Sequence, residues 1–369
     1  MRRASALLLI ALLALTGCAA PTAQADSSCA ASDAPLASLA LAEDVRTHEG
    51  GATACLPDRA ITPVDDATAP ELPVTVTDSE DRSVEVTDVD RILAIDISGT
   101  IAATVVGLGL GENLVGRDSS TDFPGTADLP VVTKAGHTLN AEAILELAPT
   151  VVLTDTSIGP KEVRQQLRDA GIPIIVVTAE RRLDTADDLV HEIAAALGVP
   201  SRGAALAERL DAELAAATAE VDAIAPAAET DRPRMLFLYV RGSANIYYIF
   251  GKDSGADSLI EAVDGVDVAG EIGWVGMKPM TAEALVSAAP DILVMMTDGL
   301  ASVNGIDGLL ERIPALQQTP AGQHRRVVDM ADADILSFGP RTAEIVRALA
   351  RAVYAPADSP AAPAPTTAP

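Results

Sequence analysis

The chain has 369 residues, of which 49% are hydrophobic, and its formal net charge is −27 at pH 7. A chain of this length can bury two hydrophobic cores, so we expect two core-forming lobes. A surface this acidic repels phosphate backbones, which excludes nucleic acid as a partner.

The N-terminal segment is typical of a secretory signal. Two arginines precede an apolar run over 4–15, which is too short to cross a bilayer and stay there. The sequence LTGC at 15–18 matches a lipobox, in which the signal is cut before a cysteine that carries a lipid. We therefore expect a signal peptide over 1–17 and an extracytoplasmic protein anchored to the cell membrane through Cys18. An ordinary signal followed by a chance cysteine is the alternative, and the sequence does not decide which membrane holds the anchor.

Residues 18–72 are rich in Pro, Ala, Thr and Asp, and we expect a lipidated tether and an irregular extension. Cys29 and Cys55 lie within it, and an oxidising compartment favours a disulfide between them. Such a bond would close a loop of roughly 25 residues and stabilise the fold by about 3 kcal/mol. Two unpaired thiols are the alternative.

Strands that alternate with helices predict an N-terminal α/β lobe over 73–200 with a mostly parallel sheet. The lobe begins with a hairpin, because two alternating apolar segments flank a short polar turn. The expected hairpin strands are 74–78 and 83–86, the later strands are 91–95, 114–116, 131–132, 151–153 and 172–177, and the helices are 99–108, 140–147, 160–170 and 184–197.

A long helix over 201–226 is expected to join this lobe to the next, because the segment is rich in Ala, Glu and Leu with a helical period. The alternation returns in a C-terminal α/β lobe over 227–354. Its expected strands are 234–240, 292–296 and 326–329, and its expected helices are 254–263, 281–288 and 340–354. The Pro/Ala-rich tail over 355–369 is expected to be disordered.

An internal repeat supports this architecture. LNAEAILELAPTVVLTD at 139–155 resembles MTAEALVSAAPDILVMMTD at 280–298, and both predict a helix, an Ala-Pro stop and an apolar strand. One copy falls in each lobe. Two similar lobes joined by one rigid helix form a cleft, and clefts between domains hold ligands.

These features resemble the helical-backbone class (class III) of substrate-binding proteins of ABC importers. The lipobox, the 74–86 hairpin, RILA at 91–94, the first repeat copy and the long helix carry the resemblance, which covers 73–354. AGHTL at 135–139 and FLYVRG at 237–242 are most similar to haemin-binding lipoproteins of the HmuT type within that class.

The resemblance implies an α/β fold of two Rossmann-like lobes with the ligand in the cleft. It implies a protein that catalyses nothing. Such a protein would capture ferric haem, free or from haem-donor proteins, and deliver it as a monomer to an ABC permease and its ATPase.

Tyr239 and Arg241 are candidate haem-binding residues. They share one face of the predicted strand, because side chains alternate with a period of two. Ligands in open α/β sheets sit beyond the carboxyl ends of the strands, where these two residues lie. A tyrosine oxygen is a known axial ligand of haem iron. Arg241 would favour the charged phenolate, pair with a haem propionate, or do both.

His137 is the candidate second iron ligand. It lies just before the helix of the first repeat copy, on a loop that is expected to face the cleft. Neutral imidazole is a common metal ligand. Together with Tyr239 it would hold the porphyrin from both lobes. A solvent-exposed loop histidine is the alternative.

Four further residues are secondary candidates. Met296 and Trp274 are expected to border the ligand, with a core methionine and a packed tryptophan as the alternatives. Glu142 and Glu283 occupy matched positions of the repeat, and the resemblance implies that they dock on the permease. First-turn acids favoured by the helix dipole are the alternative for both.

Other functions are less well supported by the sequence. The same scaffold could bind a ferric siderophore or cobalamin, which is the leading alternative to haem. A zinc or manganese receptor is disfavoured because the four histidines are scattered. The sequence contains no nucleophile elbow, P-loop or dinucleotide fingerprint that would indicate an enzyme. A haem-handling surface protein without a transporter is disfavoured by the matched glutamates.

Overall fold

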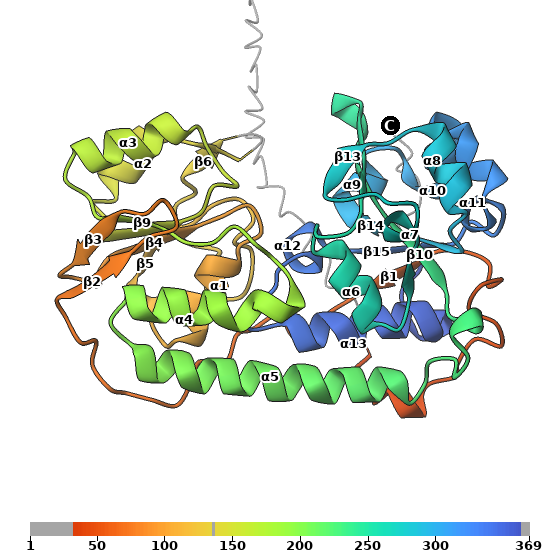
Figure 1. Ribbon diagram of the computed structural model, residues 1–369, viewed down its shortest axis with the longest axis horizontal. Coiled ribbons are helices and arrows are strands. Elements are labelled where there is room, and N and C mark those ends of the chain that lie inside the picture. Colours follow the sequence, from red (N-terminus) through yellow and green to blue (C-terminus); the bar gives the residue numbers. More distant parts are fainter. Residues whose placement is uncertain (1–31, 135–136, 363–369) are drawn as a thin grey trace, which may run out of the picture.

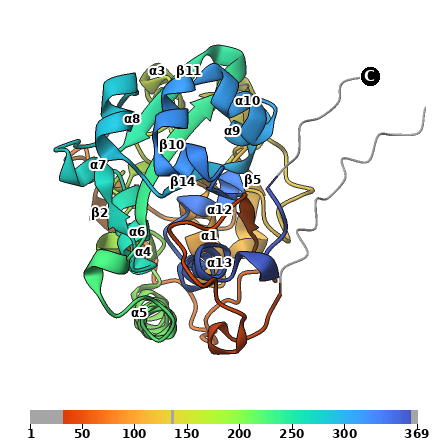
Figure 2. The ribbon, with the colours of Figure 1, turned by 90° about the vertical axis from the view of Figure 1, so that its right-hand side faces the viewer.

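The computed structural model describes residues 32–134 and 137–362, so the signal peptide, Cys18 and Cys29 lie outside the described residues. Two α/β lobes stand side by side on the long helix α5 (Pro200–Asp222), which runs beneath both of them (Figure 1). The helix packs against α4 (Ala186–Ala196) of the first lobe and against α13 (Thr342–Tyr354) of the second (Figures 1 and 2). The predicted fold class is therefore confirmed.

The first lobe is built on a four-stranded parallel sheet in the order β5-β4-β8-β9. Its strands are β4 (Ile92–Ile95), β5 (Leu114–Gly116), β8 (Val151–Thr154) and β9 (Ile174–Val176), with helices α1 (Thr100–Gly107), α2 (Ala141–Glu146) and α3 (Lys161–Asp169). The expected hairpin is present as β2 (Val74–Thr77) and β3 (Ser83–Val86), and a second, shorter one pairs β6 (Thr133–Lys134) with β7 (Thr138–Leu139).

The second lobe is built on a mixed sheet in the order β1-β15-β14-β10-β11-β13, with β12 paired to β10. Its strands are β1 (Ala52–Ala54), β10 (Arg234–Arg241), β11 (Ile246–Phe250), β12 (Val266–Asp267), β13 (Met277–Pro279), β14 (Ile292–Met296) and β15 (Val327–Met330). Its further helices are α6 (Ala256–Ala262), α7 (Val268–Glu271), α8 (Ala282–Ala288), α9 (Thr297–Ala301), α10 (Gly305–Arg312), α11 (Pro320–Gln323) and α12 (Asp332–Ile335).

Both sheets are buried on their two faces, as their nearly uninterrupted apolar strands require. In β10, Met235 and Phe237 belong to the core beneath one face, whereas Leu236 and Leu238 belong to the core on the other face. This alternation decides which β10 side chains can reach the space between the lobes. None of the helices that the structure describes is long and apolar enough to cross a membrane.

The internal repeat is present in the backbone. Each copy is a short helix followed by a central strand, α2 and β8 in one lobe and α8 and β14 in the other. Each helix is followed by a matched alanine, Ala148 after α2 and Ala289 after α8, and both alanines have a φ of 44° and precede a proline. A proline cannot continue the helix, so both copies break at the same place.

The N-terminal extension and the C-terminal tail are more ordered than the sequence suggests. Residues 52–54 form β1, which pairs in parallel with β15 and becomes the edge strand of the sheet, so the extension is not irregular throughout. The start of the tail is not disordered, because the Thr53 amide donates to the Pro360 carbonyl at 2.8 Å. An open strand edge offers backbone donors and acceptors to any extended segment, whatever its composition. The extension then crosses to the first lobe, where Ile61 and Val64 pack on the core.

Asp329 on β15 is fully buried and should make the stability of the second lobe depend on pH. Its carboxylate accepts hydrogen bonds from Thr53 at 2.9 Å and from Thr297 at 2.6 Å. Burial raises the pKa of Asp329 to about 6, from about 3.9 in an unfolded chain. The protonated Asp329 side chain therefore stabilises the fold fully below about pH 4, and this stabilisation is lost as the pH rises through about 6.

Replacing Asp329 by Asn removes this loss, because an amide does not ionise in this pH range. The hydrogen bonds can remain, since both threonine hydroxyls can rotate to suit an amide. We expect the free energy of unfolding of Asp329→Asn, relative to the unsubstituted protein, to rise by about 2–3 kcal/mol between pH 4 and pH 8. Urea unfolding at each pH measures the difference. A difference that is the same at both pH values would contradict the assignment.

Candidate functional site

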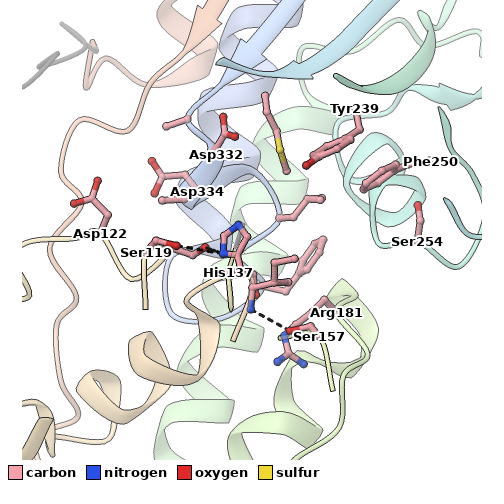
Figure 3. A pocket seen from close by; sticks show the side chains of 18 of the residues that line it. Ser119, Asp122, His137, Ser157, Arg181, Tyr239, Phe250, Ser254, Asp332 and Asp334 are labelled. Atoms are coloured by element: carbon pink, nitrogen blue, oxygen red, sulfur yellow. Dashed lines mark hydrogen bonds between the residues drawn. The ribbon is translucent and has the colours of Figure 1, made fainter. Parts of the chain in front are cut away.

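A cavity of about 2100 Å³ separates the two lobes. Its walls come from the carboxyl ends of the strands of both sheets, as expected for an α/β protein. A third wall comes from the N-terminal extension, whose residues 55–59 line the cavity between β1 and the first lobe. Figure 3 shows side chains of both lobes that converge on this space.

Tyr239 lies on the wall formed by the second lobe. It is half-buried, its ring stacks on Phe250 with centroids 5.7 Å apart, and its hydroxyl points into the cavity (Figure 3). Tyr248 of β11 pairs with Tyr239 in register and lines the cavity as well. Sequence analysis missed Tyr248 because it did not predict β11, the antiparallel strand that returns directly from β10.

Arg241 follows Tyr239 on the same face of β10, as predicted. Its guanidinium carbon lies 4.5 Å from the centroid of the Tyr239 ring, and Nη2 lies 3.6 Å from the sulfur of Met296. The same nitrogen donates to the Asp332 carboxylate at 2.5 Å. Met296 therefore lines the cavity beside Arg241, while its neighbour Met295 is buried in the core on the other face of the sheet.

Asp332 is a site residue that sequence analysis missed. It follows β15 and also accepts a hydrogen bond from the Asp298 amide at 3.0 Å. Burial raises the pKa of Asp332, and the Arg241 charge opposes that rise. The two residues are 91 positions apart, so no local pattern could have paired them.

His137 lies on the wall formed by the first lobe, in a left-handed backbone conformation with a φ of 63°. Its Nδ1 lies 3.2 Å from the Ser119 hydroxyl and 3.5 Å from that of Ser120 (Figure 3). Burial and then the Arg241 charge lower the pKa of His137, with Asp332 acting the other way. The imidazole is therefore favoured in its neutral form, which is the form that binds metals.

Asp118 holds the loop that carries Ser119 and Ser120 through hydrogen bonds to its backbone. The buried carboxylate of Asp118 accepts from the amides of Ser120 at 2.8 Å, Thr121 at 2.7 Å and Asp96 at 2.9 Å. Burial, followed by the Asp96 charge, raises the pKa of Asp118 to about 7. This scaffold fixes the two hydroxyls against His137 and so orients its ring.

The remaining predicted residues lie away from the cavity or cannot be placed in it. Trp274 packs on the core of the opposite face of the sheet, so the expectation that it borders the ligand has no support in the geometry. Glu142 and Glu283 are exposed on α2 and α8, one on each lobe. Cys55 is disulfide-bonded, and its predicted partner Cys29 lies outside the described residues.

The site has a tyrosine oxygen and an imidazole on facing walls and does not have a cluster of metal-binding carboxylates or histidines among the described residues. Among the described residues, no group of three or more His, Cys, Asp or Glu is arranged to hold a bare metal ion. A tyrosine oxygen and a neutral imidazole are both ligand types that haem iron accepts.

Comparison with known proteins agrees with this geometry. The periplasmic binding protein family model matches residues 95–333. YvrC of Bacillus subtilis (strain 168), an uncharacterized ABC transporter substrate-binding lipoprotein, is 26% identical over 287 residues, which is 76% of this chain and 86% of YvrC.

Two solved structures extend the comparison. The haem-binding protein HmuT is 43% identical with a TM-score of 0.79, and the match covers 84% of this chain and 99% of HmuT. HmuT has also been solved with single alanine substitutions at an arginine, a tyrosine and a histidine. The periplasmic haem-binding protein BhuT, in complex with two haems, is 31% identical with a TM-score of 0.61 over 71% of this chain and 97% of BhuT. With its two α/β lobes, its ligand-sized cavity and a family match over most of both lobes, this chain belongs to the periplasmic binding protein family.

Proposed function

We propose that this chain is an extracytoplasmic lipoprotein, anchored through Cys18, that binds ferric haem between its lobes and delivers it to an ABC permease. The observation that carries the proposal is the placement of Tyr239 and His137 on facing walls of one cavity. One wall supplies a phenolic oxygen and the other a neutral imidazole, so the two lobes would each contribute one axial ligand.

The residues around the cavity fit a porphyrin. The volume of about 2100 Å³ exceeds the roughly 300–1,000 Å³ of most small-ligand pockets, so a large planar ring can enter. Ile97 and Met277 are exposed at 49% and 63% and line the cavity from opposite lobes. These apolar side chains would contact the faces of the ring, which explains why they remain exposed.

Arg241 is placed to help Tyr239 act as the iron ligand. A phenol has an ordinary pKa of about 10, so its ionisation near pH 7 costs about 4 kcal/mol. Haem iron supplies most of this free energy when it is bound, and a guanidinium 4.5 Å from the ring centroid favours the anion further. Asp332 holds Arg241 in place but also offsets part of its charge.

The relatives support the same function. HmuT and BhuT bind haem, and YvrC is a substrate-binding lipoprotein of an ABC transporter. The matched glutamates Glu142 and Glu283, exposed on the two lobes, would meet two equivalent sites on the permease. In this role the chain binds and releases haem and catalyses no reaction.

The test is an absorption titration of the mature protein, from which Cys18 has been removed, with haemin. We expect a saturable change in the Soret band at micromolar protein, and the equivalence point gives one haem or two per chain. A titration without a specific Soret change would overturn the proposal. The same protein would then be tested with ferric siderophores and cobalamin.

A further inference from the structure

The cavity carries an excess of negative charge, which an anionic ligand must overcome. Among the described residues, eight carboxylates line it, against five arginines. The carboxylates belong to Asp58, Asp122, Glu180, Asp184, Asp253, Asp298, Asp332 and Asp334, and the arginines are Arg59, Arg117, Arg181, Arg182 and Arg241. A ligand that carries carboxylates therefore needs an arginine whose charge is not already neutralised.

Four of the five arginines are committed to ion pairs. Arg59 bridges Asp122 of the first lobe and Asp334 of the second. Arg181 pairs with the buried Asp155 at 2.7 Å, and Arg182 pairs with Asp257 at 3.0 Å. Arg241 pairs with Asp332 at 2.5 Å. A ligand carboxylate at any of these positions would have to displace a protein carboxylate.

Arg117 is the exception. Its Nη1 donates to the Thr121 carbonyl at 2.9 Å and to the Asp118 carbonyl at 3.4 Å, and no carboxylate of the described residues lies within 4.0 Å of it. Its Nε is buried without a hydrogen-bond partner among the described residues. The guanidinium is thus held in place by neutral acceptors while its charge and part of its donor capacity remain unused.

The position of Arg117 also suits a ligand bound by His137. Arg117 follows β5 at the carboxyl edge of the first sheet, two residues before Ser119, whose hydroxyl contacts the His137 ring. Arg117 is half-buried, so its unpaired charge is partly removed from water, and a carboxylate that completes its hydrogen bonds offsets the cost of that burial. The planar fork of an arginine matches a carboxylate with two parallel hydrogen bonds.

We propose that Arg117 binds a propionate carboxylate of the haem and makes the site selective for porphyrins with free carboxylates. This assignment rests on the proposed haem function. It gives Arg241 a different task, because the Arg241 guanidinium already pairs with Asp332 and lies over the Tyr239 ring.

The experiment compares haemin with haemin dimethyl ester, in which both propionates are neutral. The unsubstituted protein should bind haemin at least about tenfold more tightly than the ester, as expected for a hydrogen bond to a charged group. Arg117→Gln should weaken haemin binding by about tenfold or more and leave ester binding unchanged. Arg117→Lys keeps the charge but loses the planar fork of the guanidinium. Its affinity for haemin should lie between those of the unsubstituted protein and Arg117→Gln.

Arg91→Gln is the matched control. The Arg91 side chain also donates only to backbone carbonyls, those of Leu147 and Ala148, but lies outside the cavity. The Arg91→Gln variant should bind haemin and haemin dimethyl ester as tightly as the unsubstituted protein does. Equal weakening of both ligands by Arg117→Gln, or no weakening of either, would overturn the assignment. If Arg117→Gln does not fold, equal affinity of the unsubstituted protein for haemin and its ester overturns it. A protein that binds neither ligand would instead overturn the haem proposal itself.

Discussion

Tyr239→Phe should weaken haemin binding by more than about 100-fold, because even residues that only support a metal ligand contribute roughly 10–100-fold. The substitution removes one oxygen atom and leaves the stack on Phe250 and the contact with the Arg241 guanidinium in place. The loss therefore reports on ligation rather than on packing. The absorption titration measures it, and the charge-transfer bands of a ferric phenolate complex should disappear with the oxygen.

Two neighbouring tyrosines provide controls for this result. Tyr248→Phe tests the other tyrosine that lines the cavity, and it should weaken binding much less if Tyr239 is the ligand. Tyr247→Phe changes a residue that packs on the opposite face of the sheet and should have no effect. A Tyr248→Phe variant that loses the charge-transfer bands while Tyr239→Phe keeps them would reassign the ligand to Tyr248.

The part of the site that sequence could predict depends on local periodicity. Tyr239 and Arg241 lie on one face of a strand, and their common direction follows from a period of two along an apolar segment. The break after α2 and α8 likewise follows from an Ala-Pro pair at matched positions of the repeat. These features need only a few consecutive residues, so the printed sequence is enough to place them.

Other parts of the site depend on contacts between distant segments. Asp332 meets Arg241, and residues 52–54 meet β15, only because the sheet brings their strands together. Trp274 is a second example, because the sequence does not reveal that its side chain packs on the core at the opposite face of the sheet. The polarity of a segment does not reveal which strand edge or which face it will cover.

The unpaired state of Arg117 has the same origin. The sequence contains about twice as many acidic as basic residues, 53 against 26, but this ratio does not tell which arginines pair with carboxylates. The fold surrounds Arg117 with backbone carbonyls and the buried Asp118, whose carboxylate accepts from amides. The lack of a carboxylate partner for Arg117 therefore depends on the folded backbone of residues 117–121, which the sequence does not reveal.

Arg326→Ala should lower the free energy of unfolding by about 3 kcal/mol or more, because it opens a cavity and orphans buried carbonyls. Arg326 is fully buried, and its Nη2 donates to the carbonyls of Ala352 and Val353 at 2.8 and 2.9 Å. These carbonyls end α13, where the helix has no partners of its own and the dipole favours a cation. The same guanidinium reaches the Gly50 carbonyl at 3.4 Å, so it joins the sheet, the last helix and the N-terminal extension.

Two further variants separate the causes of that loss. Burial lowers the pKa of Arg326 to about 10, because a buried environment disfavours the charged form. Arg326→Met removes the buried charge and keeps most of the volume, so it should lose less stability than Arg326→Ala. Arg325→Ala removes an exposed neighbour paired with Asp307 at 2.6 Å and should cost less than about 1 kcal/mol. Urea unfolding measures all three, and equal losses for Arg325→Ala and Arg326→Ala would show that the buried bonds to α13 do not stabilise the lobe.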